Sequence, residues 1–139
     1  MQKILLDSSV FLEVMLKGTR ERQAAAVLAA VSGGRAEGVV SALSIAEVKY
    51  HALRKLGHAR ASEAAYLVQN FPNSRVVDVT PGMASTAADL RFKYYDRRNR
   101  QMSFADAVLA ATALQAGCSK IVSGDSNLKG LEEIAFEGY

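Results

Sequence analysis

The chain has 139 residues, of which 50% are hydrophobic, and only two prolines; this composition is typical of one globular, helix-rich domain covering residues 1–139 and excludes a disordered chain. No apolar run approaches the ~18 residues that a bilayer crossing needs, and the N-terminus leads directly into a strand-like segment, so we expect a cytoplasmic protein without a membrane span. Cys118 is the only cysteine, which excludes an internal disulfide and a thiolate zinc cluster, and the net charge of +3 is too small to establish nucleic-acid binding.

Short apolar runs alternate with longer segments of helical periodicity along the chain. We predict strands at 4–6, 38–41, 75–79 and 120–123, an edge strand at 134–136, and helices at 10–16, 20–31, 44–56, 59–71, 81–98, 103–116 and 126–133. Almost wholly apolar strands separated by helices predict a mostly parallel sheet covered on both faces. The fold class is therefore α/β, with four or five strands.

Four acidic residues stand at junctions between apolar segments: Asp7, Glu47, Asp106 and Asp125. Asp7 and Asp125 follow predicted strands, whereas the other two fall in the first turns of predicted helices. Because ligands of open parallel sheets bind beyond the carboxyl ends of the strands, we expect all four acids to approach one edge of the sheet. Like charges this close raise one another's pKa, and a divalent cation resolves that conflict. The pattern predicts a metal site.

Each acid also has an ordinary structural use. Ser44-x-x-Glu47 matches a capping box, and Ser103-x-x-Asp106 is a close variant of one. Asp7 can cap the helix after the first strand, and Asp125 can shape a turn. Capping alone accounts for each acid taken singly, whereas the convergence of all four on one edge favours a metal site.

The ligand types favour Mg²⁺ or Mn²⁺, because hard divalent cations prefer carboxylate and water oxygens. Zinc usually recruits histidine or thiolate, and His51 and His58 show no ligand spacing, so we expect both on the surface. The chain also lacks a Gly-x-x-x-x-Gly-Lys-Ser/Thr loop and a Gly-x-Gly-x-x-Gly turn, which argues against a nucleotide cofactor.

Basic residues form two groups. The first contains Arg91, Lys93, Arg97, Arg98 and Arg100, with two tyrosines among them, and the second contains Lys49, Arg54, Lys55 and Arg60. The first group either complements the negative C-terminal end of a helix or contacts phosphates, and both can hold together. Stacking on bases and packing in the core are the two alternatives for its tyrosines.

Four segments carry motifs of one known family: Ile4–Phe11, Ser41–Glu47, Ser103–Ala111 and Ile121–Asp125. In their order and spacing they resemble the PIN domain, and especially the compact PIN ribonucleases that are the toxins of VapBC toxin–antitoxin pairs. The resemblance spans nearly the whole chain, and Ser103–Ala111 is its most specific part. One departure follows Asp125, where many relatives have an aromatic residue and this chain continues with Ser126-Asn127-Leu128.

By that resemblance, Asp7, Glu47, Asp106 and Asp125 are the catalytic acids that hold the metal, with Asp7 and Asp106 as direct ligands. Ser9 and Ser123 would support the site, although a cap or turn hydroxyl is the alternative for either serine. The resemblance implies an endoribonuclease in which one or two Mg²⁺ or Mn²⁺ ions activate water for in-line attack on a phosphodiester, leaving a 5′-phosphate and a 3′-hydroxyl.

The resemblance also implies RNA as the substrate, an antitoxin protein as a partner and a homodimer, while the particular RNA stays unidentified. The rival interpretation is a non-catalytic PIN-like module that binds RNA or a protein partner and uses its acids only to cap helices and organise loops.

Overall fold

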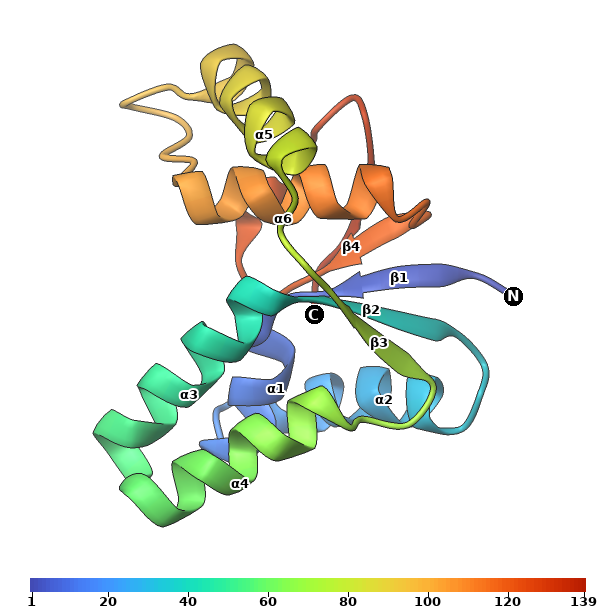
Figure 1. The fold of residues 1–139 in the computed structure, drawn as a ribbon, viewed down its shortest axis with the longest axis vertical. Helices are drawn as coiled ribbons and strands as arrows, with labels where there is room; N and C mark the ends of the chain where they lie inside the picture. Colours follow the sequence, from blue (N-terminus) through green and yellow to red (C-terminus); the bar gives the residue numbers. More distant parts are fainter.

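The computed structural model describes residues 1–139 and contains a five-stranded sheet between two layers of helices (Figure 1). The strands are β1 (Lys3–Leu6), β2 (Glu37–Ser41), β3 (Ser74–Val77), β4 (Lys120–Val122) and β5 (Ala135–Glu137). The helices are α1 (Ser8–Met15), α2 (Glu21–Ser32), α3 (Ala42–Leu56), α4 (His58–Gln69), α5 (Pro81–Tyr94) and α6 (Phe104–Gln115), with a 3₁₀ turn, η1, at Ser126–Leu128. The predicted α/β class is confirmed.

All strand pairs are parallel, and their order across the sheet is β3-β2-β1-β4-β5. From β1 the chain proceeds outward on one side through β2 and β3, and then returns to build β4 and β5 on the other side. The order of connections therefore reverses between β1 and β4. In open sheets this reversal opens a crevice at the carboxyl ends of the two strands, where ligands bind.

The two faces of the sheet bury separate cores, because successive side chains of a strand point to opposite faces. Ile4 and Leu6 of β1 pack with the layer that contains α1 to α4, whereas Leu5 packs with α5 and α6. Figure 1 shows the same division, with α5 and α6 on one side of the sheet and α1 to α4 on the other. The helices thus cover both faces and leave the strand ends open.

Side-chain caps start helices directly at the carboxyl ends of two strands. Asp7 follows β1 and accepts a hydrogen bond from the Ser8 backbone N–H as the N-cap of α1. Ser41 ends β2 and caps α3 through the Leu43 N–H. Such caps satisfy backbone donors that have no partner within the helix. As a result, both helices begin at the edge of the sheet where the crevice lies.

Two predicted helices are shorter in the structure than the sequence indicates. The helix expected to reach residue 98 ends at Tyr94, because the Asp96 carboxylate accepts hydrogen bonds from the N–H groups of Arg98 and Asn99 and folds the chain into a turn. The helix expected at 126–133 is only the 3₁₀ turn η1, and Gly130 adopts a φ of +83° soon after it. None of the helices combines the length and hydrophobicity that a bilayer crossing requires.

Candidate metal centre

Asp7 lies at the centre of a hydrogen-bonded group at the crevice between β1 and β4. Its carboxylate is only 8% exposed and accepts hydrogen bonds from the hydroxyl groups of Ser9, at 2.9 Å, and Ser123, at 2.6 Å, besides the Ser8 N–H at 2.8 Å. Ser123 directly follows β4, so this bond joins the carboxyl ends of the two central strands. Donors of this kind fix the orientation of a carboxylate.

The hydroxyl groups of Ser9 and Ser123 also accept hydrogen bonds from backbone N–H groups in the segment that follows β4. The Ser9 hydroxyl accepts from the Gly124 N–H at 3.0 Å, and the Ser123 hydroxyl accepts from the Asp125 N–H at 2.9 Å. The two hydroxyl oxygens are 3.3 Å apart. Both serines therefore contact Asp7 directly, and they also accept hydrogen bonds from the turn that was the alternative use for each.

Glu47 lies in α3 and does not cap it. The expected Ser44-x-x-Glu47 capping box is wrong, because Ser41 is the N-cap and Glu47 consequently falls in the second turn rather than the first. Neither the Ser44 hydroxyl nor Glu47 Oε1 has a hydrogen-bond partner, although both atoms are buried. A buried carboxylate oxygen without a donor is costly, and such an atom calls for an explanation by a bound group.

The pKa of Glu47 shows which charged groups lie near it. Burial raises the pKa of the Glu47 carboxyl, and the nearby charges of Asp7 and Asp106 raise it further. The Ser8 hydroxyl opposes this rise. Glu47 therefore points into a region of negative charge that helices α1, α3 and α6 share.

Asp106 is the third residue of α6 and forms the predicted capping box. Its N–H donates to the Ser103 hydroxyl at 3.0 Å, and its Oδ2 accepts from the Ser103 N–H at 3.1 Å. Burial raises the pKa of the Asp106 carboxyl; hydrogen bonding of that carboxyl to Ser103 opposes the rise, and the charges of Asp125 and Asp7 add to it. Asp106 Oδ1 accepts no hydrogen bond, so capping leaves one oxygen open to another partner.

Asp125 is the most exposed of the four acids. It precedes η1 and accepts from the backbone N–H of Asn127 at 3.0 Å and from the side-chain amide of the same residue at 3.4 Å. This is the turn-shaping use that the sequence allowed. Its charge still reaches Asp106, as the pKa of that residue shows.

The structure thus brings the four acids to one edge of the sheet, within electrostatic range of one another. It does not close them into a cage, because no group of three or more Asp, Glu, His or Cys side chains lies close enough together to hold one ion. Carboxylate and hydroxyl oxygens surround the crevice, and the two histidines, His51 and His58, are exposed elsewhere. This set of atoms fits a hard divalent cation and not zinc.

The first basic group divides into bound and free members. Arg91 donates to the Met102 carbonyl at 3.0 Å, Lys93 pairs with Glu132 and Glu133, and Arg100 donates to the Lys129 carbonyl. The remaining two residues lie beyond the end of α5, and their side chains form no hydrogen bond or ion pair: Arg97 and Arg98. Only these two are fully available for phosphate contact.

Two aromatic residues near the acids were not predicted as part of the site. Tyr139 donates a hydrogen bond to Ser9 at 3.3 Å, across a separation of 130 residues, and nothing in the local sequence indicates this contact. Phe104 is 62% exposed in the first turn of α6, two residues before Asp106. Its position between the helix cap and the acid was a feature of the sequence from which its place near the site could have been predicted.

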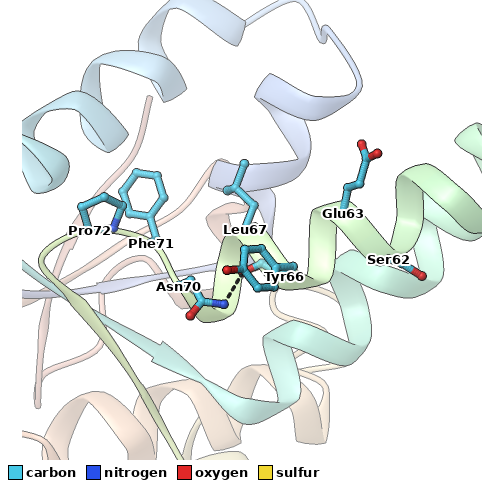
Figure 2. A pocket seen from close by; sticks show the side chains of 7 residues that line it. All are labelled: Ser62, Glu63, Tyr66, Leu67, Asn70, Phe71 and Pro72. Carbon is cyan, nitrogen blue, oxygen red and sulfur yellow. Dashed lines mark hydrogen bonds between the residues drawn. The ribbon is translucent and has the colours of Figure 1, made fainter.

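A hollow of the surface lies away from the four acids. It measures about 680 Å³ and is lined by residues of α4 and the segment that follows it: Ser62, Glu63, Tyr66, Leu67, Asn70, Phe71 and Pro72 (Figure 2). The end of α4 leads into the start of β3, so this hollow is near the amino ends of the strands, at the opposite edge from the acids. Its lining is mainly apolar and has no cluster of carboxylates.

Comparison with known proteins agrees with this fold. A PIN domain family model matches residues 4–135. A chain from the VapBC2 complex of Rickettsia felis bound to promoter DNA superposes with a TM-score of 0.76 at 12% identity, covering 99% of this chain and 98% of that one. VapC20 of Mycobacterium tuberculosis, a toxin that cleaves the sarcin–ricin loop, gives 0.73 at 22% identity, with 94% and 98% covered. FitAcB of Neisseria gonorrhoeae gives 0.69 at 22% identity, with 96% and 95% covered.

A search of curated proteins finds no match. The structural similarities are all below 25% identity and describe the fold, whereas the family model covers nearly the whole chain. The parallel sheet with helices on both faces agrees with that match. The chain belongs to the PIN domain family.

Proposed function

We propose that the protein is a divalent-metal-dependent endoribonuclease that hydrolyses RNA phosphodiester bonds with Mg²⁺ or Mn²⁺. The observation that carries the proposal is the convergence of Asp7, Glu47, Asp106 and Asp125 on the crevice between β1 and β4, with one oxygen of Glu47 buried and without a donor. Structural capping accounts for three of these acids but not for Glu47. A cation gives that oxygen a partner and offsets the mutual repulsion of the group.

The proposed roles follow from the contacts of each acid. Asp7 and Asp106 are assigned as direct ligands: the hydroxyl groups of Ser9 and Ser123 fix the first, and the second has an open Oδ1. Glu47 and Asp125 complete the shell directly or through water. A bound divalent ion supplies Lewis acidity that activates a water for in-line attack on the phosphodiester and stabilises the leaving 3′ oxygen.

We further propose that this nuclease is the toxin of a type II toxin–antitoxin pair and acts as a homodimer. The fold similarity to VapBC and FitAcB proteins supports this biological role. An antitoxin partner needs an apolar surface on the toxin, and the hollow on α4 with its exposed Tyr66 and Leu67 provides one (Figure 2). Co-expression with the product of an adjacent small reading frame, followed by sizing of the complex, tests the pairing.

The test of the chemistry is single-turnover cleavage of a structured RNA by wild-type protein and by Asp106→Asn. The variant keeps the size and the capping acceptor of the side chain but loses its charge, so cleavage in Mg²⁺ or Mn²⁺ should fall by about 100-fold or more. Asp89→Asn, an exposed aspartate of α5, is the matched control and should cleave like wild type. Equal cleavage in EDTA, or full activity of Asp106→Asn, would eliminate this mechanism.

A non-catalytic module that binds RNA or a partner is the second candidate. The observation in its favour is that Asp7, Asp106 and Asp125 all make capping contacts and that no preformed metal cage exists. Calorimetric titration with Mn²⁺ separates the two. Uptake of metal that disappears in Asp7→Asn and Asp106→Asn supports the enzyme, whereas RNA binding without metal uptake or turnover supports the module.

A further inference from the structure

Three side chains form an exposed stack beside the candidate metal centre. The Arg91 guanidinium lies between two aromatic rings, with its central carbon 4.4 Å from the centre of the Phe104 ring and 4.5 Å from that of Tyr95. Phe104 is 62% exposed and Tyr95 is 44% exposed. Neither aromatic residue belongs to the buried core, so packing within the domain does not explain the arrangement.

The stack is held in place from both sides. Arg91 is anchored by a 3.0 Å hydrogen bond from Nε to the Met102 carbonyl. Phe104 is the first residue of α6, directly after the Ser103 N-cap, and the capping box fixes this turn. Side chains that are already ordered lose little conformational entropy when a ligand binds to them.

The stack and one of the four acids share the first turn of α6. Phe104 precedes Asp106 by two residues in the same helical turn, so their Cα atoms are roughly 5.5 Å apart by helix geometry, while their side chains project toward different faces of α6. Arg97 and Arg98, the two free cations, follow Tyr95 in the chain. Aromatic rings, a planar guanidinium and basic residues next to a phosphodiester-cleaving centre are the combination that binds unpaired nucleotides.

We propose that Phe104, with Arg91 and Tyr95, is a stacking site for an unpaired RNA base adjacent to the bond that is cleaved. This inference rests on the proposed nuclease function and identifies the residues that would hold the base. The solvent-facing side of Phe104 receives the base, and Arg91 supports the ring from the other side and adds positive charge near the phosphates. Phe104 selects unpaired substrate, because a paired base is not free to leave its helix and stack here.

The alternative is that the stack is an interface between copies of this chain. The charge of Arg91 favours RNA, because a guanidinium at the centre of an apolar contact between copies would need an acidic partner, whereas RNA supplies phosphates. The oligomeric state of the variants distinguishes this alternative from the proposal.

The test compares binding of a labelled oligoadenylate with binding of an abasic strand that has the same phosphates, both in EDTA so that nothing is cleaved. Wild-type protein should bind the oligoadenylate more tightly. Phe104→Ala should lose about 10-fold in affinity for the oligoadenylate and nothing for the abasic strand, and Phe104→Trp should retain wild-type affinity. Phe92→Ala is the matched control, because Phe92 is 93% exposed on α5 and has no stacked cation.

Equal losses on both strands, unchanged binding of Phe104→Ala, or a wild-type protein without preference for bases would overturn the proposal. A change of oligomeric state in Phe104→Ala on size exclusion would overturn it in favour of the interface. Because this assay needs no cleavage, its outcome is independent of the nuclease test: base-selective binding without cleavage in Mg²⁺ or Mn²⁺ refutes the nuclease alone, and cleavage that is indifferent to Phe104 refutes the stacking site alone.

Discussion

The Ser123 hydroxyl donates a 2.6 Å hydrogen bond to the Asp7 carboxylate, across 116 residues of sequence. Both residues are buried, and the bond joins the carboxyl ends of β1 and β4. The same hydroxyl accepts the Asp125 N–H, so one oxygen positions two of the four acids. The geometry of the crevice therefore depends on a side chain that carries no charge.

Ser123→Ala should lower the free energy of unfolding by about 1.5–3 kcal/mol, because it removes a buried hydrogen bond to a charged group and leaves the Asp125 N–H without its acceptor. Affinity for Mn²⁺ should fall by about 10- to 100-fold, as for other residues that orient metal ligands. Urea unfolding and calorimetry measure the two effects. Ser119→Ala is the control, since Ser119 joins the same strands at their other end through an exposed bond to the Lys3 carbonyl; equal effects of the two substitutions would contradict a specific role for Ser123.

Glu47→Gln should stabilise the metal-free protein at neutral pH. The pKa of Glu47 is raised above its ordinary value of 4.5, so the stability associated with its protonated form is fully present below pH 4.5 and is lost as the pH rises through the folded-state pKa. Removing the charge should therefore raise the free energy of unfolding at pH 7. Near pH 4 the two proteins should be equally stable.

Thermal or urea unfolding at both pH values checks this expectation, with the exposed Glu63→Gln of α4 as the control. Mg²⁺ or Mn²⁺ should raise the melting temperature of wild-type protein and have a smaller effect on Glu47→Gln. A variant less stable than wild type at pH 7 without metal would show that Glu47 is not held in a repulsive environment.

The double substitution Arg97→Ala and Arg98→Ala should weaken RNA binding through loss of phosphate contacts. Each contact to a single strand contributes about 0.7 to the slope of log affinity against log salt concentration, so the slope should become shallower by about 1.4. Fluorescence anisotropy over a salt series measures it. Lys55→Ala with Arg60→Ala, from the second basic group, removes the same charge and should leave the slope unchanged; equal changes would mean that binding follows net charge alone.

Much of the fold was predictable because its signals are local. The strands are short apolar runs, Gly57 separates α3 from α4, and α4 ends shortly before Pro72. Two of the errors fall where a side chain, and not a glycine or proline, starts or ends a helix. Asp96 ends α5 four residues earlier than the periodicity suggests, and Ser41 starts α3 before Ser44.

The candidate site was predictable in outline. Parallel strands and helix starts placed the four acids at one edge, and the structure agrees; the roles of these residues stay predictions. Contacts such as Tyr139 with Ser9 and Arg91 with Phe104 could not be predicted from the sequence, because they join elements whose relative positions only the packed fold determines.

The pairing of β1 with β4 has a consequence for synthesis in the cell. Asp7 obtains its Ser123 partner only after the 116 residues that separate the two have been made, and pairing across so long a separation is slow because the intervening chain must first be ordered. A nascent chain that lacks β4 has neither Asp125 nor the hydroxyl that orients Asp7. The four acids can therefore come together only after β4 has been made and has paired with β1.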